Sequence, residues 1–273
     1  MDRKKSFLNV GVSLTFKIIN LILSVLVRRA LIIHCGNELN GLTALYTSII
    51  GFLSAAELGI GTAISFGMYR PIVENDRKKL AALFGLFRKL YRIVAAFILI
   101  AGLFITPFLP HLAKDYLQIG ADLYGSFILM LISAALSYLF GAETALISAY
   151  RNNYIATAIT SGGLCLQNIL QIVVLSQTGS FHSFLYCRIA AALIQYAAAK
   201  TFTQKNYAPI VQAKEKPDAA MKTELKKNLR AMFMHKIGAL LVNSLDGVII
   251  SAFIGVAALG KYSNYTTIMA SVG

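Results

Sequence analysis

Charged residues and cysteines are both scarce in this sequence. Only 14% of its 273 residues are charged, whereas 57% are hydrophobic, and a soluble domain carries about 25% charged residues. The composition therefore excludes an ordinary soluble domain. The three cysteines, Cys35, Cys165 and Cys187, are scattered and form no CxxC or Cys/His spacing. They predict neither a disulfide framework nor a metal site, and are interpreted as small apolar residues that fill space.

Apolar runs long enough to cross a bilayer, which takes about 20 helical residues, recur along the chain. They predict an all-α, polytopic transmembrane bundle. The expected spans are 7–33, 41–69, 92–110, 121–149, 155–175, 181–201, 231–254 and 259–273, the last of which is short. The basic start of the chain is followed by no small-residue cleavage pattern. The first apolar run is therefore predicted to be a membrane helix and not a signal peptide.

The formal net charge of +14 is distributed unevenly along the chain. Nineteen Lys and Arg residues fall in the N-terminus, the 70–92 loop, position 151 and the 200–230 segment, which the spans place on one side. The opposite loops hold only Lys114. This asymmetry places the N-terminus in the cytoplasm and favours contact with anionic lipid headgroups. Because topology accounts for the charge, no nucleic-acid partner is expected.

A repeat relates the two ends of the chain. Moving the sequence 219 positions along itself brings nine identities into register over the 33 positions from Lys17 to Ile49, including Gly36 on Gly255 and Gly41 on Gly260. Six predicted spans separate the copies, so the copies are parallel, and internal repeats of this kind are typical of secondary transporters. We expect a six-helix lobe over 1–200, a cytoplasmic linker over 201–230 and an incomplete second lobe over 231–273.

Polar residues mark one face of several predicted membrane helices. In the first span they recur at steps of three or four, which places them within an arc of roughly 100°. Charged groups at membrane depth cost about 2.5–3.5 kcal/mol on insertion scales and usually face a bundle interior or an aqueous cavity. The predicted cavity residues are Lys17, Asn20, Arg28, Arg29, Glu57, Gln167, Gln171, Lys236, Asn243 and Asp246.

These residues leave structural alternatives open. Arg28 and Arg29 could extend to the membrane interface, Glu57 could neutralise an arginine within the bundle, and Ser/Thr stripes are often packing faces. Four of the candidates at membrane depth are cationic and only two are carboxylates. Because arginine can donate two hydrogen bonds to one phosphate, the excess predicts a basic cavity for a phosphate-bearing substrate.

Several segments resemble the signatures of bacterial polysaccharide flippases, which export capsule or O-antigen repeat units. The segments are 56–64 (AELGIGTAI), 69–71 (YRP), 76–80 (DRKKL), 235–238 (HKIG), 246–255 (DGVIISAFIG) and 262–265 (YSNY). The resemblance covers essentially the whole chain. It implies membership of the superfamily that includes lipid II flippases and multidrug extruders, with two six-helix lobes around a central cavity and alternating access. Members usually run to nearly twice this length, so most of the second lobe is missing.

The resemblance implies a flippase that moves undecaprenyl-pyrophosphate-linked oligosaccharide across the cytoplasmic membrane. Arginines of the first helix would contact the pyrophosphate, and polymerases and glycosyltransferases of the same pathway are the implied protein partners. The alternatives are a small-molecule or drug antiporter of the same superfamily and an inactive truncated fragment of a flippase. An enzyme is not expected, because Walker, GxSxG and HExxH patterns are absent and the outer loops are short. No cofactor or metal is expected.

Overall fold

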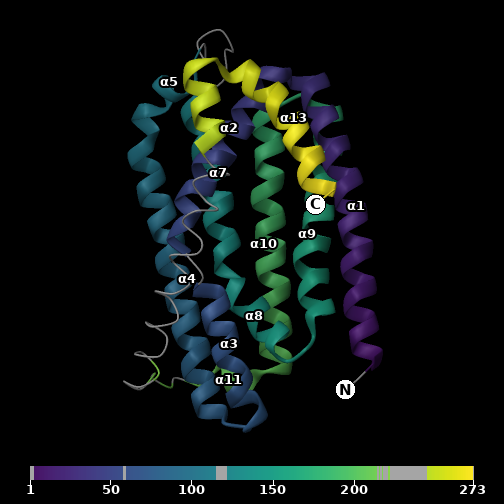
Figure 1. Ribbon diagram of the computed structural model, residues 1–273, viewed down its shortest axis with the longest axis vertical. Helices are drawn as coiled ribbons and strands as arrows, with labels where there is room; N and C mark the ends of the chain where they lie inside the picture. The colour runs from purple at the N-terminus through teal and green to yellow at the C-terminus, as the bar shows by residue number, and fades with distance from the viewer. Residues whose placement is uncertain are drawn as a thin grey trace.

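The computed structural model describes residues 3–57, 60–114, 122–213 and 245–272, together with positions 215, 217 and 221. This described part is helical and contains no strand, which confirms the all-α prediction. The long helices lie side by side in an elongated bundle (Figure 1). Four described segments are long and apolar enough to cross a membrane, which indicates a multi-pass membrane protein. They are Leu8–Cys35, Arg77–Leu112, Leu123–Ala149 and Asn153–Thr178.

The helices run either up or down between the lower and upper ends of the bundle in Figure 1. The helices that rise are α1 (Arg3–Cys35), α4 (Arg77–Ile105) and α9 (Asn153–Thr178). Those that descend are α2 (Asn37–Leu53), α3 (Ile60–Val73), α7 (Leu123–Leu139), α8 (Gly141–Ala149), α10 (Phe181–Asn206) and α13 (Val256–Val272). Short pieces are η1 (Ser54–Glu57), η2 (Thr106–Phe108), α5 (Leu109–Leu112) and α11 (Ala208–Val211).

Two of the predicted spans are interrupted helices. The 41–69 run consists of α2, the 3₁₀ turn η1 and α3, and the 121–149 run consists of α7 and α8, which meet at Phe140 and Gly141. Because both runs are apolar throughout, their hydropathy did not predict the interruptions. Of the predicted 231–254 span, only residues 245–253 fall among the described helical positions. The first residues of the predicted 201–230 linker instead continue α10, which ends at Asn206, and form α11. Positions 214, 216, 218–220 and 222–230 lie outside the described residues.

Buried apolar side chains form two clusters along the bundle. One joins α2, α7 and α10 and contains Tyr46, Phe127 and Leu185. The other joins α3, α4 and α8 and contains Phe84 and Leu146. The outward faces of the same helices are also apolar, as expected when lipid and not water surrounds them.

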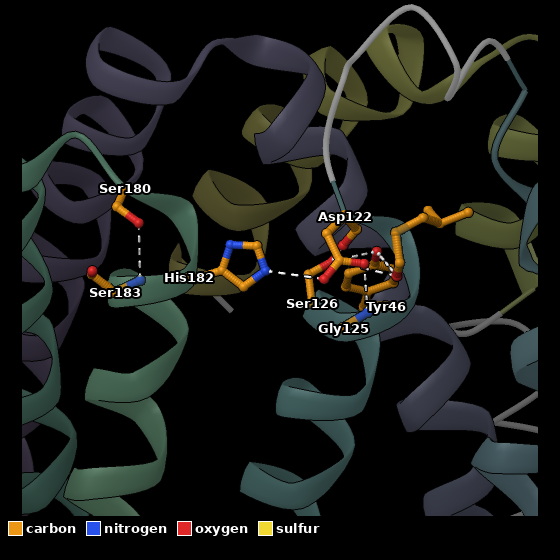
Figure 2. Close-up of polar contacts among 8 residues, drawn as sticks. Tyr46, Asp122, Gly125, Ser126, Ser180, His182 and Ser183 are labelled. Carbon is orange, nitrogen blue, oxygen red and sulfur yellow. Dashed lines mark hydrogen bonds and ion pairs between the residues drawn. The ribbon is translucent and has the colours of Figure 1, made fainter.

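Polar contacts fix the upper ends of α7 and α10 (Figure 2). Asp122 caps α7, since its Oδ1 accepts a hydrogen bond from the backbone N–H of Gly125 at 2.9 Å. This bond is the main reason why the pKa of the Asp122 carboxyl lies below its usual value, and the neighbouring His182 lowers it further. His182 Nε2 lies 3.3 Å from Asp122 Oδ2, which links the two helices. Below this pair, the Tyr46 hydroxyl donates to Leu123 O at 2.8 Å.

Candidate functional site

The polar stripe of α1 serves two different purposes. One edge of it packs on α9, where Asn9 Oδ1 accepts from Tyr154 N at 2.7 Å and Asn20 Nδ2 donates to Ser161 O at 3.1 Å. The other edge carries Lys17 and Arg28. These lie about 80–100° around the helix from Asn9, at 100° per residue. Asn20 is therefore a packing residue in this structure, although the spacing placed it with the cavity residues.

Lys17 and Arg29 are exposed on α1. Lys17 follows Leu8, the first residue of the candidate span, by nine positions, which corresponds to about 13 Å of helix. Exposed Leu14 and Ile18 flank it. Neither cation forms an ion pair within the described part of the chain.

Arg28 reaches from α1 to α13. Its Nη1 donates to the backbone carbonyl of Ser263, and it also lies 3.3 Å from Ser263 Oγ and 3.2 Å from Asn264 Oδ1. Buried Asn40 of α2 joins the same group, since its Nδ2 donates to Gly260 O at 3.1 Å and to Asn264 Oδ1 at 3.3 Å. Arg28 is therefore half-buried in a polar contact between the first and last described helices.

The contact between α2 and α13 is reciprocal. A side chain on Gly41 would collide with the carbonyl oxygen of Val256, and a Cβ on Gly260 would lie 2.6 Å from the carbonyl oxygen of Asn37. Position 41 corresponds to 260 in the repeat, and 37 corresponds to 256. In each copy, therefore, the glycine (41 or 260) approaches the equivalent residue of the other copy (256 or 37). This reciprocity is expected for packing around a two-fold axis.

Glycines also mark the same turn in both copies. Gly36 precedes α2 with a φ of 91°, and Gly255 precedes α13 with a φ of 133°. These values lie in the region that side chains disfavour, so glycine is required at both turns. Asn37, directly after the first turn, donates from Nδ2 to Ala257 O at 2.9 Å. The glycine shared by the two copies therefore corresponds to a positive-φ turn before the second helix in each copy.

Glu57 occupies the interruption between α2 and α3. Its Oε1 accepts a hydrogen bond of 2.6 Å from the hydroxyl of Tyr91 on α4. The Tyr91 ring fits against Gly141, where α7 gives way to α8, and lies 5.8 Å from the ring of Tyr138. None of the ion pairs among the described residues includes Glu57. Tyr91 thus brings the interruptions of two spans together beside a carboxylate, and nothing in the sequence singled it out.

The remaining candidates are dispersed. Gln171 is buried and donates to Phe184 O at 3.1 Å, which makes it a bridge between α9 and α10. Gln167 is half-buried on α9. Asp246 is exposed and accepts from the Tyr262 hydroxyl at 3.1 Å. Lys236 and Asn243 lie outside the described residues.

A buried ion pair that was not predicted from the sequence lies near the lower end of the bundle. Arg88 Nε lies 3.2 Å from Oε1 of Glu143, whose side chain is only 2% exposed. Glu143 belongs to a run of small and apolar residues in α8, and spacing gave no signal that it would meet a cation from α4. No described group of His, Cys, Asp and Glu side chains could hold a metal ion.

The comparisons with known proteins bear on the fold alone. No family model matches the chain, and no curated protein matches it. A solved structure named only "protein A" is similar, with a TM-score of 0.73 and 15% sequence identity. The similarity covers 100% of this chain and 61% of that chain. This protein therefore shares its helical arrangement with a longer protein, of which it spans about three-fifths.

Proposed function

We propose that this chain is part of a flippase that moves undecaprenyl-pyrophosphate-linked oligosaccharide repeat units across the cytoplasmic membrane for surface polysaccharide synthesis. The helices from α1 to α10 form one six-helix lobe. Residues 231–273 begin a second lobe that is parallel to the first. The substrate passes between the lobes, while its polyprenyl tail stays in the surrounding lipid.

The reciprocal packing of α2 and α13 supports the two-lobed arrangement. Two helices that occupy equivalent positions of a repeat meet through equivalent glycines, as expected at the seam between two similar halves. The polar group of Arg28, Asn40 and Asn264 lies along the same seam. Binding sites of transporters built from repeats lie at the interface between the repeats, near mid-membrane. The seam is thus the expected boundary of the transport path.

One observation carries the proposal: α1 has exposed cations within its apolar span. Lys17 is exposed nine residues inside the span Leu8–Cys35, where contact with lipid tails would cost several kcal/mol. Arg29 is exposed six residues, about 9 Å of helix, before the end of the same span. A water-lined path that receives an anionic substrate removes this cost. A pyrophosphate would meet Lys17 and Arg29 one after the other along such a path, because twelve residues, about 18 Å of helix, separate the two cations.

The membrane orientation follows from the lower end of the bundle, where exposed cations gather on α4 and α10. Arg77, Lys78, Lys89 and Lys205 are exposed there, which by the positive-inside rule supports a cytoplasmic position for this end. Export then proceeds toward the end that holds Cys35 and Gly179. The protein is a carrier and not an enzyme, it needs no cofactor, and its protein partners are the polymerase and glycosyltransferases that act on the same lipid-linked sugars.

A small-molecule or drug antiporter is the alternative function on the same fold. It would need an acidic, aromatic cavity for organic cations. The exposed charged residues along the α1 span are Lys17 and Arg29, both cationic. This sign disfavours an antiporter of organic cations.

The test is a double replacement, Lys17→Ala with Arg29→Ala, in cells that depend on this protein for surface polysaccharide. Charge-assisted hydrogen bonds contribute about 1.5–3 kcal/mol each, so we expect export to fall by roughly tenfold or more while lipid-linked precursors accumulate. Arg28→Ala is left out because Arg28 also holds the seam. Surface polymer and precursor are measured together.

Two controls accompany this test. Lys17→Arg with Arg29→Lys keeps both charges and should preserve most export. Lys78→Ala with Lys205→Ala removes two exposed cations outside the path and should leave export unchanged. Equal export by the double alanine variant and the wild type, at equal membrane abundance, would exclude a role for these cations in transport.

A further inference from the structure

A cluster of charges lies near the lower end of the bundle, away from the seam. Buried Glu143 of α8 forms its centre, and its Oε1 lies 3.2 Å from Nε of Arg88 on α4. Oε2 is buried and has no hydrogen-bond partner in the described structure. The pair is therefore not the two-bond fork that arginine can make with a carboxylate. The terminal nitrogens of Arg88 are not used by Glu143.

Positive charge exceeds negative charge in this cluster. Arg92 lies four residues after Arg88, on the same face of α4, and Lys200 comes from α10. Arg88 contacts the carboxylate of Glu143, and the charges of Arg92 and Lys200 also act on it. Arg92 is exposed and Lys200 half-buried, and neither makes an ion pair with another described residue. The cluster therefore has an excess of positive charge.

The depth of the cluster matches a lipid phosphate. Lys200 precedes the end of α10 by six residues, and Glu143 precedes the end of α8 by six, which is about 9 Å of helix in each case. Above the cluster, the exposed residues of the same helices are apolar and include Ile93, Phe97 and Ile194. The cations therefore lie where the apolar surface ends and the basic end of the bundle begins.

We propose that Arg88, Arg92 and Lys200 bind the phosphate of an anionic phospholipid from the cytoplasmic leaflet. Glu143 holds Arg88 in place and leaves its terminal nitrogens to donate to the phosphate. Arg92 and Lys200 supply the remaining charge, and the apolar faces of α4 and α10 accommodate the acyl chains. Basic sites between membrane helices on the cytoplasmic side are suited to such headgroups. The proposal relies on the membrane orientation of the proposed function but not on transport.

The experiment compares the purified protein in nanodiscs of phosphatidylcholine alone with nanodiscs in which part of that lipid is replaced by phosphatidylglycerol. Thermal unfolding and retention of phosphatidylglycerol in native mass spectrometry are the two readouts. We expect phosphatidylglycerol to raise the Tm of the wild type. In Arg92→Gln with Lys200→Gln, most of this rise should disappear, and retention should fall roughly tenfold or more.

A matched control removes two exposed cations of the same helices from outside the cluster. Lys89→Gln with Lys205→Gln should keep the response to phosphatidylglycerol. Arg92→Lys with Lys200→Arg keeps both charges and should respond like the wild type, which separates loss of the site from loss of folding. Equal loss in the cluster and control variants would overturn the proposal in favour of diffuse surface attraction. So would a full response to inorganic phosphate added to phosphatidylcholine nanodiscs, since that result would identify a site for soluble phosphate. Because neither readout involves transport, a failed export test leaves this result unaffected.

Discussion

At the scale of single residues, Asp122 carries the clearest electrostatic consequence. It lies before the first residue of α7, accepts a hydrogen bond from Gly125 N, and faces His182 of α10 (Figure 2). The bond to the backbone stabilises the ionised carboxylate, so the pKa of Asp122 is lower in the folded protein than in the unfolded chain. The charged form therefore contributes stability to the fold.

Replacing Asp122 by alanine should destabilise the protein by about 0.5–2 kcal/mol, the usual cost of losing a helix cap. Asp122→Asn should retain most of the cap. The stabilisation from the Asp122 charge should be complete above the ordinary aspartate pKa of about 4. It should be lost as pH falls through the lower folded value. Thermal unfolding across this acidic range measures both effects, and an Asp122→Asn protein with the same pH dependence as the wild type would contradict this assignment.

Single residues also show where the sequence could and could not be interpreted. The steps of three and four in α1 correctly predict a helix with a polar face. They cannot divide that face between the packing residue Asn20 and the exposed Lys17, because the division depends on where α9 and α13 lie. Glu57 was identifiable as a charge within an apolar run. Its partner Tyr91 was not, since that contact joins positions 34 residues apart.

At the scale of elements, the close approach of α2 and α13 depends on the absence of side chains at Gly41 and Gly260. Overpacking of a tight contact typically costs about 1–3 kcal/mol. We expect Gly41→Ala to lower the free energy of unfolding by that amount, because the added methyl meets backbone atoms of α13 that cannot rotate away. The measurement is thermal or denaturant unfolding in detergent.

Gly67 of α3 provides the matched control. A Cβ there would meet only Leu83, at 3.8 Å, in ordinary contact. Gly67→Ala should therefore be neutral or stabilising by up to about 1 kcal/mol, the gain in helix propensity. If Gly41→Ala were as stable as Gly67→Ala, the helices would not be as close as described.

The sequence predicts where the long helices lie better than it predicts where they are interrupted. The apolar runs predict α1 and α9 close to their observed limits, because length and hydropathy are enough to specify a membrane helix. The predicted 181–201 span is also a helix, α10, although it is not among the four described segments apolar enough to cross a membrane. The interruptions at η1 and at Phe140 depend on tertiary packing. There, Tyr91 of α4 fills the space beside Gly61 and Gly141. Such packing leaves no trace in a hydropathy profile.

At the scale of the whole molecule, the proposed two-lobed arrangement depends on the repeat, and the proposed membrane orientation depends on the uneven distribution of Lys and Arg. The offset of 219 residues predicts that positions 36 and 255 play the same role, and both are glycine turns with positive φ. It does not predict that the two copies face each other through positions 37, 41, 256 and 260, since a repeat fixes similarity and not docking. That arrangement required the structure.

Cross-linking across the seam tests the central claim most directly. The experiment uses Asn37→Cys with Ala257→Cys, with the three native cysteines replaced by serine and a protease site placed near Ala213. A short reducible bis-methanethiosulfonate reagent should join the two cysteines, so that the protease fragments stay together. If the proposed function is right, export of surface polysaccharide should stop, because cross-linked α2 and α13 can no longer separate, and should resume after reduction. Fragments that separate despite the reagent, or cross-linked protein that exports normally, would contradict the account.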